Sequence, residues 1–101
     1  MSVIIATKVS GDTSVFTKSL AERADEYRQW GERGRAAGAI HHQFAVGDGF
    51  VLVVDEWEST EAFQKFFGDP EIQAFIGSVG GDPKVAPEVT MGESVDSADK
   101  Y

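Results

Sequence analysis

The chain has 101 residues, of which 42% are apolar and 26% are charged, and it carries a net charge of −8. This length suits one domain with a single hydrophobic core, and the composition is typical of folded soluble chains. Acidic side chains outnumber basic ones by eleven to three in residues 51–101, so the chain lacks the positive surface that nucleic acids and anionic lipids attract. Without cysteine, it contains no disulfide, thiolate nucleophile or cysteine-based metal site.

Hydropathy gives no indication of a membrane or export segment. The longest apolar run, Phe50 to Val54, is far shorter than the roughly 20 residues that span a bilayer. The first eight residues lack the basic region that opens a secretion signal. We therefore expect a cytoplasmic protein that binds neither membrane nor nucleic acid.

The first half of the chain predicts a strand followed by a helix. Residues 2–9 are rich in β-branched side chains and end at Ser10-Gly11-Asp12, which is typical of a strand and a turn. Asp12 is a good N-cap for a helix that runs to about residue 34 and frays before Gly38. Its apolar residues recur at three- and four-residue spacing, which places them on one face: Phe16, Leu20, Ala24, Tyr27 and Trp30.

A β-hairpin follows. Residues 39–46 and 50–57 are strand-like, and Gly47-Asp48-Gly49 supplies the flexible loop between them. A three-residue loop pairs Val46 with Phe50. The face toward the helices then consists of Ile40, His42, Phe44, Leu52, Val54 and Glu56, and the opposite face of Ala39, His41, Gln43, Ala45, Val51, Val53, Asp55 and Trp57. On that opposite face, His41 and Asp55 form a cross-strand pair.

The second half predicts another helical region and a final strand. Ser59 or Thr60 caps a helix, and Asp69-Pro70-Glu71 restarts it with an N-cap, a proline at the first position and an acid in the first turn. Residues 84–91 read as a strand that Pro87 confines to a sheet edge. We expect residues 1–91 to form the domain and residues 92–101 to be an acidic, polar tail.

The element order β-α-β-β-α-β predicts an α+β, ferredoxin-like domain with an antiparallel sheet. Right-handed crossovers place both helical regions on one face of that sheet. The other face is too apolar to be wholly wet, so we expect a homodimer in which two sheets pack together. The expected interface residues are His41, Asp55 and Trp57.

Three segments carry a resemblance to a known family: Gly38-Ala39-Ile40, Val53-Val54-Asp55-Glu56-Trp57-Glu58-Ser59-Thr60-Glu61-Ala62-Phe63, and Asp69-Pro70-Glu71-Ile72-Gln73-Ala74-Phe75. Over about residues 3–91 the chain resembles the antibiotic biosynthesis monooxygenase-like family. The most specific part is the acid-Trp-acid end of the third strand. The resemblance implies a dimeric α/β barrel with a pocket between each sheet and its helices. Members include cofactor-independent oxygenases of aromatic polyketides, quinol oxygenases and haem-degrading enzymes.

The chain also departs from that family. Many members carry a histidine on the second helix, at the position that aligns with Phe66. The positions that align with the haem-degrading residues are Thr7, Phe66 and Ile76, and none is retained. The resemblance therefore argues against haem chemistry, and we expect no cofactor.

Two residues are candidates for acid-base chemistry. His42 on an apolar strand face is a candidate general base, although a packed core histidine is the commoner use of such a residue. Glu56 lies near the end of the same predicted face, where a desolvated carboxyl could act as acid or base, or could simply reach water. Adjacent strand residues point to opposite faces, so His41 and His42 cannot chelate one metal ion, and we expect no metal site.

Aromatic and aliphatic side chains of the helices are expected to line a hydrophobic pocket. The candidate substrate-binding residues are Tyr27, Trp30, Phe44, Phe63, Phe66, Phe67 and Ile76. Each of them could equally be a packing residue.

Two functions follow as hypotheses. The first is a cofactor-independent monooxygenase, or a related isomerase or cyclase, that acts on a hydrophobic aromatic or polyketide-like molecule. The second is a non-catalytic dimeric protein that binds a hydrophobic ligand. A purely structural domain is the remaining possibility if no cavity exists.

Overall fold

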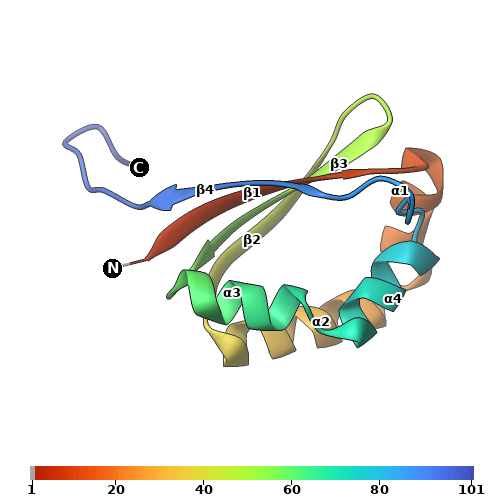
Figure 1. The fold of residues 1–101 in the computed structure, drawn as a ribbon, viewed down its shortest axis with the longest axis horizontal. Helices are drawn as coiled ribbons and strands as arrows, with labels where there is room; N and C mark the ends of the chain where they lie inside the picture. Colours follow the sequence, from red (N-terminus) through yellow and green to blue (C-terminus); the bar gives the residue numbers. More distant parts are fainter. Residues whose placement is uncertain (1) are drawn as a thin grey trace.

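The computed structural model describes residues 2–101 and shows a four-stranded antiparallel sheet with every helix on one face (Figure 1). The elements are β1 (Val3–Ser10), α1 (Thr13–Glu22), α2 (Ala24–Ala37), β2 (Ala39–Val46), β3 (Phe50–Trp57), α3 (Thr60–Phe67), α4 (Pro70–Ser78) and β4 (Glu88–Glu93). The strand order is β2-β3-β1-β4. The predicted α+β, ferredoxin-like order is confirmed, with each predicted helical region built as two consecutive helices.

The first helical region begins as predicted and breaks where no break was predicted. The Asp12 carboxylate accepts hydrogen bonds from the backbone N–H groups of Ser14 and Val15, which caps α1. At Arg23 the backbone leaves the helical region (φ −122°, ψ 33°), and this turn redirects α2. Because of the break, Leu20 is 38% exposed instead of facing the sheet. The region ends at Gly38, whose φ of +122° favours glycine.

The second helical region follows its capping residues. The Ser59 hydroxyl accepts from the N–H of Ala62, and the Asp69 carboxylate accepts from the N–H of Glu71. Pro70 occupies the start of α4, where its missing N–H costs nothing.

The last strand lies at the sheet edge, as Pro87 predicts. β4 begins directly after that proline and continues two residues beyond the predicted end at Met91, to Glu93. The N–H of Ser94 then donates to the carbonyl of Ser2, which extends the contact with the start of β1. The rest of the C-terminal segment runs beyond the sheet (Figure 1).

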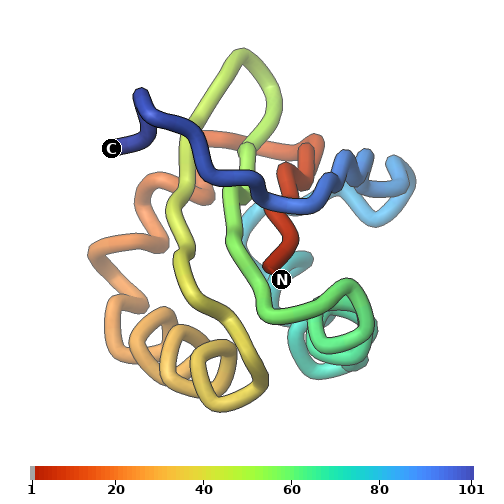
Figure 2. The backbone as a smooth tube through the Cα atoms, turned by 90° about the vertical axis from the view of Figure 1, so that its left-hand side faces the viewer, coloured from red at the N-terminus to blue at the C-terminus, as the bar shows by residue number. Residues whose placement is uncertain are grey.

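The register of the β2–β3 hairpin differs by one residue from the prediction. Val46 pairs with Val51, because the N–H of Gly47 donates to the carbonyl of Phe50 and makes Phe50 part of the turn. The Phe50 ring lies against Gly47, in space that a β-carbon there would fill. The loop itself extends past the sheet, as Figure 2 shows in yellow-green.

This shift reverses every side chain of β3, since one residue of slip exchanges the two faces of a strand. Val51, Val53, Asp55 and Trp57 face the helices, and Phe50, Leu52, Val54 and Glu56 face away. On β2 the prediction is right for His42 and Phe44. It is wrong for Ala39 and Ile40, because a bulge between Ala39 and His41 turns Ala39 toward the helices and leaves Ile40 56% exposed.

The face without helices is called the open face below. Its residues are Ile4, Ala6, Lys8, His41, Gln43, Ala45, Phe50, Leu52, Val54, Glu56, Glu88, Thr90 and Gly92. The centre of this face is apolar, and Ile4 is 49% exposed on it. No segment of residues 2–101 covers it (Figure 1).

The core on the helix side has two parts. Val3, Ile5, Trp57 and Phe63 form one buried cluster, and Phe16, Val51 and Val79 form the other. The space between the sheet and the helices thus has a packed region at each end, which positions the cavity described below.

We predict opposite effects for two glycine substitutions in and after α2. Gly38→Ala places a side chain at positive φ and brings its β-carbon to 3.2 Å from a Glu58 carboxylate oxygen. It should therefore lower the free energy of unfolding by about 1–2 kcal/mol. Gly31→Ala adds a β-carbon within α2, and no other atom lies within 4 Å of that carbon. Since alanine favours a helix more than glycine does, this substitution should raise the free energy of unfolding by up to about 1 kcal/mol. Urea unfolding measures both; equal effects would contradict the assignment of the helix end.

Candidate functional site

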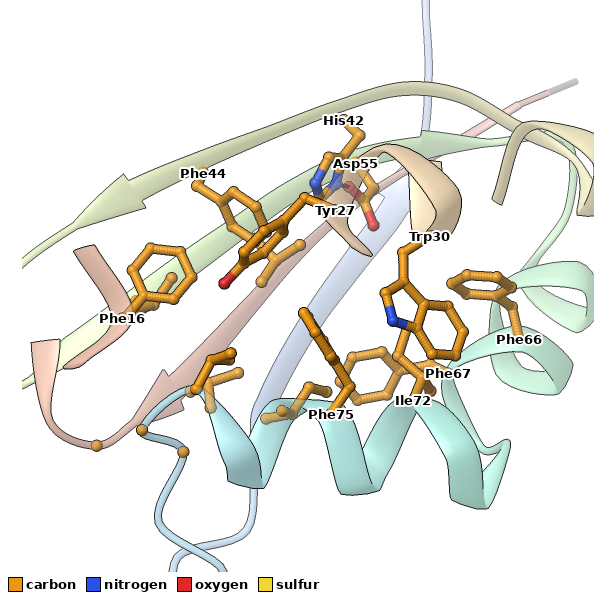
Figure 3. A pocket seen from close by; sticks show the side chains of 18 of the residues that line it. Phe16, Tyr27, Trp30, His42, Phe44, Asp55, Phe66, Phe67, Ile72 and Phe75 are labelled. Atoms are coloured by element: carbon orange, nitrogen blue, oxygen red, sulfur yellow. Dashed lines mark hydrogen bonds and ion pairs between the residues drawn. The ribbon is translucent and has the colours of Figure 1, made fainter. Parts of the chain in front are cut away.

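A cavity of about 140 Å³ lies between the sheet and the helices (Figure 3). Its floor is the helix-facing side of β2 and β3, and its other walls are α1, α2, α3 and α4. The aromatic side chains that line it are Phe16, Tyr27, Trp30, Phe44, Trp57, Phe63, Phe66, Phe67 and Phe75. A cavity with such walls favours a flat, apolar ligand.

Helical spacing brings these rings together. Tyr27 and Trp30 lie three residues apart in α2, so both point to the same side of that helix. Phe63, Phe66 and Phe67 do the same in α3. The sheet contributes Phe44 from β2, which Figure 3 shows beside Tyr27.

The rings hold one another edge to face. Tyr27 meets Phe44 with centroids 5.9 Å apart at 85°, and it meets Phe75 at 5.2 Å and 79°. Trp30 meets Phe66 at 6.0 Å and 86°. Such T-shaped pairs are worth about 0.5–1.5 kcal/mol each beyond their buried area. The cavity walls are therefore mutually supported.

The main polar group of the cavity is a buried carboxylate with two donors. Asp55 is 7% exposed; its Oδ1 accepts a hydrogen bond from His42 Nδ1 over 2.7 Å, and its Oδ2 accepts one from Trp57 Nε1 over 3.1 Å. A buried carboxylate needs such partners, since an unpaired one is costly. The observed β2–β3 register places His42 opposite Asp55, which makes the pair possible.

This arrangement fixes the His42 ring. A carboxylate only accepts hydrogen bonds, so the proton of the neutral ring lies on Nδ1. Nε2 then keeps its lone pair, and it has no hydrogen-bond partner among residues 2–101. The ring lines the cavity while its side chain is 45% exposed, so His42 is accessible both from the cavity and from solvent.

Tyr27 is polar but already engaged. Ser19 gives its only hydroxyl proton to the carbonyl of Phe16 over 2.5 Å, so the Tyr27 hydroxyl donates to Ser19 Oγ over 2.6 Å. Burial raises the pKa of the Tyr27 phenol above its usual value. Tyr27 therefore stays neutral and can offer a ligand only an acceptor oxygen.

Trp30 presents a second free polar atom. Its indole N–H has no hydrogen-bond partner within residues 2–101, and the ring lines the cavity. Figure 3 shows Trp30 and Phe75 on the side of the cavity away from His42 and Asp55. The cavity thus has an acceptor nitrogen at one place and a donor N–H at another.

Two arginines join α1 and α2 to α4 outside the cavity. Arg23, between α1 and α2, donates to the Ser78 hydroxyl over 2.8 Å and stacks 4.7 Å from the centroid of Phe75. Arg33 pairs with Glu71 and stacks 4.1 Å from the centroid of Trp30. These contacts join the first helical region to α4 beside the cavity.

The seven predicted substrate-binding residues all line this cavity: Tyr27, Trp30, Phe44, Phe63, Phe66, Phe67 and Ile76. Their role in binding stays a prediction. His42 lies in the same cavity, as expected for a general base.

Glu56 does not lie beside His42. It is on the open face, where its carboxylate accepts a hydrogen bond from the Ser2 hydroxyl over 2.5 Å. The prediction placed it in the pocket because it assumed a three-residue hairpin loop; the longer turn reverses β3. Glu56 is therefore not part of this cavity.

The three residues predicted at a dimer interface lie on two different faces. His41 is on the open face, opposite Glu56. Asp55 and Trp57 are buried against the helices, so the predicted His41–Asp55 pair is wrong and Asp55 binds His42 instead. The same one-residue difference in register explains both errors.

Sequence reasoning missed the role of Asp55 in this site, and it gave no binding role to Val51 or Val53. It also gave no binding role to Ile72 or Phe75, which line the cavity. The sequence did contain a signal for Asp55. The glycines at positions 47 and 49 suit a four-residue hairpin loop as well as a three-residue one, and the four-residue loop places Asp55 opposite His42.

Within residues 2–101, no group of three or more His, Asp or Glu side chains is arranged to hold a metal ion. None of the helices in that range is long and apolar enough to cross a membrane.

The fold is shared with solved structures. A monooxygenase from the gene ActVA-Orf6 of Streptomyces coelicolor, in complex with nanaomycin D, superposes with a TM-score of 0.67 at 17% identity, covering 98% of this chain and 92% of that one. A dimeric ferredoxin-like protein from an uncultured marine organism gives 0.63 at 18% identity, covering 99% and 93%. SnoaB, a cofactor-independent oxygenase of Streptomyces nogalater, gives 0.59 at 12%, covering 98% of each chain.

The chain has the ferredoxin-like fold of antibiotic biosynthesis monooxygenase-like proteins. The predicted resemblance is thus confirmed at the level of fold. No family profile and no curated protein matches the sequence. At identities this low, likeness of fold does not fix chemistry, which has to be argued from the site.

We predict that Asp55→Asn lowers the free energy of unfolding by about 1 kcal/mol, since an amide replaces both hydrogen bonds of the carboxylate with weaker neutral ones. Asp48→Asn is the matched control, because Asp48 is exposed in the hairpin loop. Chemical unfolding of both variants measures the difference. Equal stability of the two variants would show that the buried carboxylate is not held by both donors.

Proposed function

We propose that this protein is a cofactor-independent monooxygenase that acts on a hydrophobic aromatic small molecule bearing an ionisable hydroxyl group. The observation that carries the proposal is the aromatic cavity with the His42–Asp55 pair in its wall. The fold shared with a monooxygenase and a cofactor-independent oxygenase supports it.

The proposed reaction begins with proton transfer. His42 Nε2 takes the proton of the substrate hydroxyl, and the imidazolium that forms is stabilised by the Asp55 carboxylate. Trp57 donates to the other oxygen of Asp55 and so fixes the carboxylate in place. Asp55 and Trp57 are positioning residues in this scheme, and of these three side chains only His42 takes a proton from the substrate.

The electron-rich phenolate then reduces dioxygen. One electron passes to O2, and the two radicals combine to form a C–O bond at the ring carbon para to the oxygen, giving a peroxide anion. The protonated His42 gives its proton to this anion, which becomes a hydroperoxide. His42 then removes the proton on that ring carbon as the O–O bond breaks, and it returns the proton to the departing hydroxide, so that a quinone and water result. A phenol and O2 thus yield a para-quinone and H2O, without another reductant.

Oxygen uptake with electron-rich phenols in metal-free buffer tests this proposal. We expect His42→Ala to lower the turnover number by about 10²–10⁴-fold, the usual contribution of a general base. Lys18→Ala is the control and should retain activity, since Lys18 is exposed on α1, away from both the cavity and the open face. Equal turnover of the two variants, or no uptake by the wild-type protein across a broad panel, would contradict the proposal.

We also propose that the working molecule is a homodimer joined through the open face. The support is the apolar centre of that face, where Ile4 is 49% exposed and Leu52 and Val54 are partly exposed, and which the helices of the same chain leave uncovered. A dimeric protein of the same fold adds to it. Sheet-to-sheet packing with two-fold symmetry is the simplest closed arrangement.

Sedimentation equilibrium at micromolar concentration tests the dimer. Leu52→Lys places a charge in the centre of the open face, so this variant should be monomeric while the wild-type protein is dimeric. Ala36→Lys, on the exposed side of α2, is the control and should remain dimeric. A wild-type monomer, or a dimer that Leu52→Lys leaves intact, would contradict this interface.

Binding without catalysis is the second candidate. Phe66 stands where many family members carry a helix-two histidine, so one group that could serve in catalysis is replaced by a ring of the cavity wall. A stoichiometric apolar molecule found by native mass spectrometry, in protein that consumes no oxygen, would favour this function over oxygenation.

A further inference from the structure

We infer that the aromatic cavity takes up only ligands without negative charge, so that its substrates are neutral phenols and aromatic carboxylates are excluded. The inference rests on the proposed function and narrows its substrate class. It depends on the charges of the groups that line the cavity and not on the volume of the cavity.

The ionisable side chains in the cavity wall offer no net positive charge. Among residues 2–101, no lysine or arginine lines the cavity. Asp55 lines it together with His42, which is hydrogen-bonded to one of the carboxylate oxygens. This pair is negative when the imidazole is neutral and uncharged when the imidazole is protonated. It therefore never presents a net positive charge to an anion.

A second carboxylate borders the cavity. Asp12 is one of the lining residues, and it accepts hydrogen bonds from the backbone N–H groups of Ser14 and Val15 at the start of α1. The hydrogen bond from the Ser14 hydroxyl lowers the pKa of Asp12, so this carboxylate is charged at neutral pH. Free N–H groups at the start of a helix attract anions. At α1, Asp12 already occupies them, so they do not attract a ligand carboxylate.

Two arginines lie against the helical wall, and each is paired with a carboxylate outside the cavity. Arg23 donates two hydrogen bonds to Glu26, over 2.8 and 2.6 Å, and Arg33 pairs with Glu71. Their guanidinium groups stack on two rings of the wall, and neither arginine lines the cavity. A ligand anion inside the cavity therefore gains no ion pair from them.

The uncharged polar atoms of the cavity favour a ligand that donates a hydrogen bond. His42 Nε2 and the Tyr27 oxygen are both acceptors. A carboxylate only accepts hydrogen bonds, and the Trp30 indole N–H offers it a single neutral donor. Aromatic and aliphatic side chains make up most of the remaining wall. Burying an unpaired carboxylate there costs far more than burying an uncharged polar group.

The proposed reaction does not require an anion to enter the cavity. A neutral phenol binds with its hydroxyl at His42, and the phenolate forms only when the proton has moved to His42 Nε2. The phenolate then lies against the imidazolium, which Asp55 stabilises. The total charge of ligand and site stays the same during this step. The cavity can therefore form an anion that it does not take up from solution.

Two ligands of nearly equal shape test the inference without any turnover. 4-Hydroxybenzamide is neutral and 4-hydroxybenzoate is anionic at neutral pH, and both carry the same phenol group. We expect 4-hydroxybenzamide to bind at least about tenfold more tightly, since only the carboxylate loses the hydration of a charge without gaining an ion pair. Both tryptophans of the chain line the cavity, so their indole N–H signals in ¹H–¹⁵N NMR spectra report binding.

A lysine in the cavity wall gives the matching arm. Ile72 lines the cavity and is only partly buried, so Ile72→Lys should fold and should narrow the preference for the amide by about tenfold. Ala74→Lys adds the same charge at an exposed position of α4 outside the cavity, and it should leave the preference unchanged. Equal narrowing by both variants, or none with Ile72→Lys, would mean that the cavity wall does not set the preference, and would overturn the inference.

The outcomes separate this inference from the proposed function. If 4-hydroxybenzoate binds the wild-type protein as tightly as 4-hydroxybenzamide does, or if neither binds, the inference is overturned. The expected preference without oxygen uptake by any neutral phenol supports the inference and contradicts oxygenation. Oxygen uptake with phenols by a protein that lacks this preference does the opposite.

Discussion

The site depends on one buried carboxylate that accepts hydrogen bonds from two side chains. Asp55 accepts one hydrogen bond from the His42 ring and one from the Trp57 indole. With both oxygens engaged, the carboxylate has a fixed orientation, and it orients the imidazole in turn. A half-exposed histidine on an edge strand thereby becomes a directed group in the wall of an apolar cavity.

That interaction follows from the hairpin turn. The bond from the Gly47 N–H to the Phe50 carbonyl determines which residues of β2 and β3 are opposite one another. With one residue fewer in the turn, Asp55 would lie on the open face and His42 would meet Val54. The turn therefore controls both the chemistry of the cavity and the apolar character of the opposite face.

Much of the fold could be predicted from local signals. Asp12, Ser59 and Asp69 cap helices as expected, and Pro87 precedes an edge strand. The pocket-lining rings of α2 and α3 could also be predicted, because helical spacing alone places them on one face. These features depend on residues that are close in sequence.

The rest depends on long-range choices. Local hydrophobicity hardly distinguishes the two possible registers of β3. The residues that face the helices in the observed register, Val51 and Val53, are about as hydrophobic as Leu52 and Val54, which would face them after a shift of one residue. What decides between the two registers is burial against the helices, where Trp57 is 2% exposed and packs on Phe63. The break at Arg23 likewise occurs at a residue that is not a helix breaker, so local propensity does not predict it. Asp55 could be assigned only after both strands were in register.

The most direct measurement of this account is the tautomer of His42, read from imidazole ¹⁵N chemical shifts in alkaline solution. The account predicts a ring with its proton on Nδ1 and a bare Nε2. A ring protonated on Nε2 would mean that Asp55 does not hold His42, and the base proposed for the reaction would be lost.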